Sequence, residues 1–131
     1  MALADTFLKG KQPQSTQFIV ELHRTLLLVK LAHYETKSFA AHEALGKTYD
    51  TVNDLADDIT EKLIGYTGEV PTVFEVGTIA VTPVASLATH IMGLGHKLAQ
   101  FAAKEFYDDV ENLAQELSGA GAKLKYLFRL S

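Results

Sequence analysis

Two histidines and two carboxylates are the residues of this 131-residue chain with the clearest chemistry: His33, His42, Asp57 and Glu61. Imidazole and carboxylate groups both bind borderline metal ions. His42 and Asp57 are 15 residues apart, which is roughly 22 Å on a helix that rises about 1.5 Å per residue. Asp57 and Glu61 lie one helical turn apart, so both can reach one ion. One ion can therefore bind all four side chains only if the histidines and the carboxylates come from different copies of the chain.

Helices must position these residues, because apolar side chains recur at helical spacing along most of the chain. A first helix is predicted to begin at a cap formed by Ser15 or Thr16 and to run to about Glu35. Residues 36–38 then predict a tight turn or kink. The apolar stripe of this first helix consists of Phe18, Ile19, Leu22, Leu26, Leu27, Val29 and Leu31.

The second helix has the most regular apolar pattern, with spacings of four and three in alternation: Leu45, Tyr49, Val52, Ala56, Ile59 and Leu63. It is expected to end within residues 65–68, before Pro71. Residues 67–83 contain both later prolines and several Thr, Val and Gly residues. They predict a long connection that has room for one short turn of helix.

Two further helices are predicted after this connection. The third begins after Pro83, and its stripe consists of Leu87, Ile91, Leu94, Leu98 and Phe101. The fourth begins at about Tyr107, and its stripe consists of Val110, Leu113, Leu117, Leu124 and Leu127. Gly119 and Gly121 cost stability inside this helix, so we expect close approach by a neighbouring helix or subunit there.

The predicted fold is all-α, with residues 1–14 as a flexible N-terminal tail and residues 15–131 as a four-helix bundle. A short link follows the first helix, and a long crossover connects helices 2 and 3. This is the connectivity of ferritin-like bundles.

Composition narrows the class of protein. Apolar residues make up 47% and charged residues 21% of the chain, which is typical of a globular domain. The absence of Cys excludes disulfide scaffolds, Cys-ligated metals and thiol catalysis, and we expect a cytoplasmic protein without a secretory signal. The longest apolar run, residues 26–29, is too short to cross a membrane. The net charge is −4 and the tail carries only Lys9 and Lys11, so DNA binding is predicted to be weak or absent.

Residues 33–71 resemble the core of the Dps-type miniferritins. In that family one histidine ends the first helix, a second histidine followed by Glu opens the next helix, and a D-x-x-x-E pair precedes a Gly/Pro turn. His42-Glu43 matches the second histidine, and Asp57 with Glu61 matches the acidic pair at the family spacing. Residues 109–130 also resemble the family's fourth helix.

The resemblance implies a homo-oligomeric shell, typically a dodecamer built from two-fold dimers. Each two-fold interface would bind ferrous iron between the histidines of one chain and the acids of its partner. Glu61 would bridge or anchor the ion, with Asp57, His42 and His33 as terminal ligands. The implied activity is that of a ferroxidase, which oxidises iron(II) with peroxide or dioxygen and stores ferric mineral.

Three departures from the family pattern leave a second hypothesis open. Gly46 stands where the family usually has an acidic ligand, so we expect a site to hold only a single ion. The two histidines are only nine residues apart, and Tyr34, interpreted as a packing residue, replaces a common Trp. The alternative is a non-catalytic ferritin-fold structural or interaction protein, phage-encoded, with a degraded or absent metal site. We interpret His90 and His96 as ordinary side chains, with a metal contact at a pore or on the surface as the alternative.

Overall fold

The computed structural model describes residues 12–130, and this range contains four α-helices and no strand. They are α2 (Gln14–Glu35), α3 (Phe39–Thr67), α4 (Val84–Glu105) and α5 (Asp108–Phe128). The predicted all-α class is confirmed. Most of the predicted tail, with Lys9 and Lys11, lies outside the described residues, and the first described helix begins at Gln14. None of the helices within residues 12–130 has the length and hydrophobicity needed to span a membrane.

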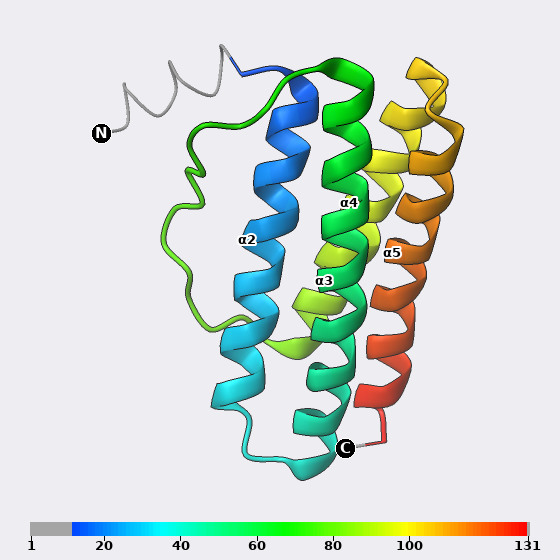
Figure 1. Cartoon of the computed structure of the whole chain (residues 1–131). Helices are drawn as coiled ribbons and strands as arrows, with labels where there is room; N and C mark the ends of the chain where they lie inside the picture. The colour runs from blue at the N-terminus through cyan, green and yellow to red at the C-terminus, as the bar shows by residue number, and fades with distance from the viewer. Residues whose placement is uncertain (1–11, 131) are drawn as a thin grey trace.

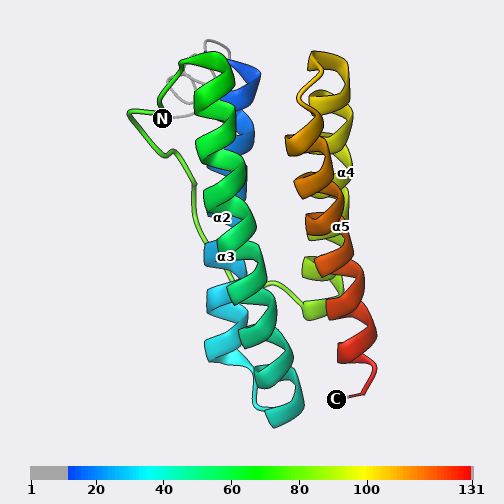
Figure 2. The same ribbon diagram turned by 45° about the vertical axis from the view of Figure 1, so that its right-hand side comes forward.

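The helices form two antiparallel hairpins, α2 with α3 and α4 with α5 (Figure 1). Between them, the crossover (residues 68–83) runs back along α2, so α3 and α4 point in the same direction (Figures 1 and 2). Every residue of the crossover is described, and it contains no helical turn. The long connection predicted from the sequence is confirmed, but the short helix for which it had room does not form.

The ends of α3 follow local sequence signals. The Ser38 hydroxyl accepts a hydrogen bond from the backbone N–H of Ala41 at 3.2 Å, which satisfies one of the free N–H groups of the first turn. Gly68 ends the helix in the left-handed conformation, with φ 72°, and its N–H donates to the Ile64 carbonyl at 2.7 Å. Glycine adopts this conformation without the steric cost that a side chain imposes.

The predicted cap of the first helix is wrong. Pro13 precedes the first residue of α2 and provides no side-chain hydrogen bond. Ser15 and Thr16 lie inside the helix and are buried. Pro13 contributes through its backbone instead, because its carbonyl oxygen accepts a hydrogen bond from the Gln17 N–H at 3.1 Å.

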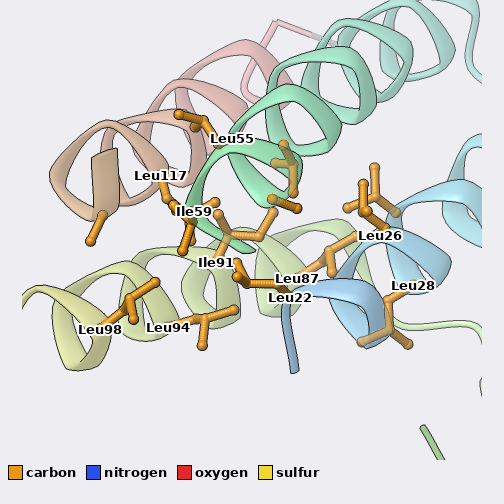
Figure 3. Packing of buried hydrophobic residues seen from close by; sticks show 14 of the residues in the cluster. Leu22, Leu26, Leu28, Leu55, Ile59, Leu87, Ile91, Leu94, Leu98 and Leu117 are labelled. Carbon is orange, nitrogen blue, oxygen red and sulfur yellow. The ribbon is translucent and has the colours of Figure 1, made fainter. Parts of the chain in front are cut away.

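The core lies between the two hairpins and receives apolar side chains from all four helices (Figure 3). Most residues of the predicted stripes are buried there, while Phe18, Tyr49, Phe101, Leu113 and Leu127 pack at its margin. Leu27 is the clear exception, with 45% of its surface exposed. The stripe predicted for the first helix was wider than the face that α2 buries.

Two glycines allow α4 and α5 to pack backbone against backbone. A Cβ at Gly95 would lie 2.5 Å from the backbone nitrogen of Ser118, and one at Gly121 would lie 2.8 Å from the carbonyl oxygen of Ala88. The close approach predicted at Gly121 is therefore confirmed. A Cβ at Gly119 would meet nothing within 4 Å, so packing within the described residues does not offset the cost of that glycine.

Candidate metal centre

The turn between α2 and α3 brings the two histidines together. His33 lies in the last turn of α2 and His42 in the first turn of α3. Their ring centroids are 3.9 Å apart and their planes differ by 23°, so the rings are stacked. Both side chains are half-buried. The tight turn predicted at residues 36–38 is confirmed. We call His33 and His42 the histidine pair.

Two reciprocal hydrogen bonds orient the histidine pair. His33 Nδ1 lies 3.1 Å from the carbonyl oxygen of His42, and His42 Nδ1 lies 3.1 Å from the carbonyl oxygen of His33. A carbonyl oxygen only accepts, so each Nδ1 must carry the proton. In the neutral rings both Nε2 atoms are then lone-pair donors, and neither has a hydrogen-bond partner within residues 12–130. Metal-binding histidines are commonly oriented by a carbonyl on the other nitrogen in this way.

Stacking limits how the histidine pair can bind an ion. An imidazole binds a metal in the plane of its own ring, about 2.1 Å from the nitrogen for zinc. Two nearly parallel planes at a centroid separation of 3.9 Å cannot both contain the same ion. In the stacked arrangement the two Nε2 lone pairs therefore point to two different ion positions. One of the rings must rotate before both can bind the same ion.

Gly46 leaves space for the His33 ring. A Cβ at this position would lie 3.2 Å from Cε1 and 3.6 Å from Nδ1 of His33. The sequence indicated only that Gly46 supplies no carboxylate. The structure adds that a larger side chain would press on the ring that completes the stack.

Gly46→Leu is therefore expected to separate the stacked rings and to destabilise the protein by about 1–3 kcal/mol, the usual cost of overpacking. Gly65→Leu is the matched control, because it lies on the same helix and a Cβ there would meet nothing within 4 Å. Urea unfolding measures the difference between the two variants, and imidazole nitrogen NMR reports the loss of the Nδ1 hydrogen bonds. Equal stability of the two variants would contradict the packing role of Gly46.

The acidic pair, Asp57 and Glu61, lies on the same helix as His42. α3 is continuous from Phe39 to Thr67, so the separation of roughly 22 Å applies. Both acids are exposed. Residues 12–130 contain no group of three or more side chains that could hold a metal ion. One chain thus brings its histidines together and holds its acidic pair at a distance from them.

Tyr34, interpreted from the sequence as a packing residue, lies outside the core. It is 66% exposed, and its ring lies 5.8 Å from that of His33 and beneath the Lys30 ammonium at 5.5 Å. Tyr34 thus packs on neighbouring side chains at the surface, where the last turn of α2 places it.

A second polar cluster, which the sequence did not indicate, joins α2 to α4. Thr25 Oγ1 donates to the carbonyl oxygen of Glu21 at 2.8 Å and lies 2.9 Å from His90 Nε2. His90 Nε2 is also 3.3 Å from a carboxylate oxygen of Glu21. His90 is therefore more than the ordinary side chain of the sequence interpretation. No spacing rule could have found this cluster, because its residues lie on different helices.

Comparison with known proteins gives a family and one distant relative. Residues 33–128 match a family of unknown function, DUF5856. The chain is 24% identical over 132 residues to the "Uncharacterized 14.6 kDa protein in mobD-ri intergenic region" of Enterobacteria phage T4, with 99% of each sequence covered. No solved structure matches the chain. The region that matches the family includes the histidine pair and the acidic pair.

Proposed function

This chain belongs to the DUF5856 family, and we propose that it is a ferritin-like, Dps-type subunit that binds ferrous iron between two copies and oxidises it. The observation that supports this most is the histidine pair, in which both Nδ1 atoms are held by carbonyls and both Nε2 atoms are left for a ligand. The single long crossover between two hairpins supports the same proposal, because ferritin-like bundles have this connectivity.

The donor set suits iron as the substrate. Imidazole nitrogens and carboxylate oxygens together are ligands that iron accepts. Two copies of α3 that run antiparallel about a two-fold axis would place the histidine pair of each copy against the acidic pair of the other, which creates two equivalent sites. Each ferrous ion would give one electron to peroxide or dioxygen, and the ferric product would be stored in a cytoplasmic shell, a dodecamer in proteins of the Dps type.

A second candidate function is that of a non-catalytic ferritin-fold structural or interaction protein, phage-encoded like the T4 relative. Gly46 favours this candidate. The His33 ring occupies the space beside Gly46, where Dps-type proteins usually carry an acidic ligand.

Ferrous iron added to the purified protein under air or with peroxide is expected to be oxidised faster than in buffer. Ferric absorbance follows the reaction. The expected acceleration comes from the inter-subunit site, which fixes the ion beside donors that stabilise the ferric state. A rate equal to that of buffer would contradict the ferroxidase proposal and support the non-catalytic candidate.

The mass of the protein in solution tests the assembly on which the site depends. We expect a dimer or a larger closed assembly, because one chain keeps its acidic pair roughly 22 Å from His42. Light scattering coupled to size exclusion measures this mass. A stable monomer at micromolar concentration would contradict a shared site.

A further inference from the structure

A cleft of about 790 Å³ lies between the first half of α2, α4 and the crossover, at a distance along α2 from the histidine pair. Apolar and charged side chains share its walls. The apolar part includes Phe18, Val20 and Leu94. The charged part consists of Glu21, Arg24, Glu75 and Lys97, and His90 also lines the cleft.

Hydrogen bonding fixes the tautomer of His90 at this wall. Thr25 is fully buried, and its hydroxyl proton is used by the Glu21 carbonyl. Thr25 Oγ1 can therefore only accept from His90 Nε2, so Nε2 carries a proton. The same Nε2–H faces the Glu21 carboxylate at 3.3 Å. In the neutral ring Nδ1 is left as an acceptor.

Arg24 is anchored to the crossover. Its Nε donates to the Val76 carbonyl at 3.1 Å. Its Nη1 lies 3.8 Å from the Glu21 carboxylate, which is too long for a hydrogen bond. The terminal donors of the guanidinium thus make no hydrogen bond within residues 12–130, and their planar arrangement suits a carboxylate.

Lys97 and Glu75 provide the remaining charges of the cleft. Neither forms an ion pair within the described part of the chain. Among the described residues that line the cleft, two acids and two bases cancel in formal charge. Arg24 lies beside Glu21 but keeps its terminal N–H groups for a ligand, whereas Lys97 and Glu75 have no charged partner in residues 12–130. A ligand with one charge would be attracted by Lys97 or Glu75 and repelled by the other. A ligand that carries both a positive and a negative charge can pair with both residues.

We propose that this cleft binds a small zwitterion, an apolar α-amino acid. Its carboxylate would face Arg24 and Lys97, its ammonium group would face Glu75, and its side chain would lie against the apolar wall. The volume falls in the range of small-molecule sites, about 300–1,000 Å³. The proposal is independent of iron binding.

Calorimetric titration of the full chain with three matched probes tests the need for both charges. L-Phenylalanine carries both, 3-phenylpropionate lacks the ammonium group, and phenethylamine lacks the carboxylate. We expect saturable binding of L-phenylalanine at least about tenfold tighter than of either analogue. Equal binding of an analogue would overturn the zwitterion assignment. No saturable binding of L-phenylalanine or of L-leucine would overturn the site.

Two pairs of variants locate the binding. A Cβ at Gly93, which lines the cleft, would meet nothing within 4 Å, so Gly93→Leu should fill the cleft and abolish binding while the helical CD signal persists. Gly65→Leu, outside the cleft, should bind as the parent does.

Lys97→Gln should weaken L-phenylalanine binding at least about fivefold, and Lys104→Gln, exposed on the same helix, should not. Unchanged binding by Gly93→Leu would show that the probe binds elsewhere.

Discussion

Gly95→Ala is expected to destabilise the protein by about 2–3 kcal/mol, whereas Gly93→Ala on the same helix should stabilise it by up to about 1 kcal/mol. The added Cβ at position 95 would lie 2.5 Å from the backbone nitrogen of Ser118 and 2.7 Å from the carbonyl oxygen of Ala114. Backbone atoms cannot change rotamer, so α4 and α5 must separate to accommodate one methyl group. At position 93 the same methyl group meets nothing within 4 Å, and only the helix propensity changes.

Urea unfolding followed by CD gives both free energies by linear extrapolation. α5 provides a second matched pair, because a Cβ at Gly121 would lie 2.8 Å from the Ala88 carbonyl oxygen while one at Gly119 would meet nothing within 4 Å. Gly121→Ala should therefore behave like Gly95→Ala, and Gly119→Ala like Gly93→Ala. Equal stabilities of Gly95→Ala and Gly93→Ala would show that α4 and α5 are not in backbone contact in solution.

These glycines show which parts of the fold the sequence can predict. The helix boundaries at Gly68 and Pro83 were predictable for opposite reasons. Glycine adopts the left-handed conformation that ends a helix without steric cost, whereas the proline ring fixes φ and removes the backbone N–H. Gly93 and Gly95 are two residues apart in one helical pattern, and no local property distinguishes them. Only the path of α5 across α4 makes one of them necessary, so their different roles had to come from the structure.

The candidate metal centre was likewise predictable only in part. The sequence predicted a tight turn at residues 36–38, between His33 and His42, and two helix ends joined by such a turn lie close together. It could not predict that the rings stack or that each Nδ1 donates to the other residue's carbonyl, since these depend on side-chain rotamers. The sequence also could not predict that the space beside Gly46 is filled, because the ring that fills it belongs to His33 on α2.

Glu61→Gln is expected to reduce ferrous iron oxidation to the rate in buffer and to weaken ferrous binding at least about tenfold, or about 1.4 kcal/mol. The free energy of unfolding should change by less than about 0.5 kcal/mol. Glu61 is exposed and forms no ion pair within residues 12–130, so the fold does not depend on its charge. Asp54→Asn is the matched control, because it removes the same charge from an exposed site on the same helix. Equal losses in both variants would indicate a general effect of negative charge rather than a ligand.

A mixture of two inactive variants tests whether the site is shared between copies. His42→Ala retains its acidic pair and Glu61→Gln retains its histidine pair, so each variant alone should be inactive. After random exchange of subunits, one site in four receives histidines from one variant and acids from the other, and the mixture should recover about a quarter of the parental rate. A site contained within one chain gives no recovery, because every chain carries one defect. An inactive mixture, with exchange verified by mass spectrometry, would therefore contradict the inter-subunit site while the parental oxidation rate stands.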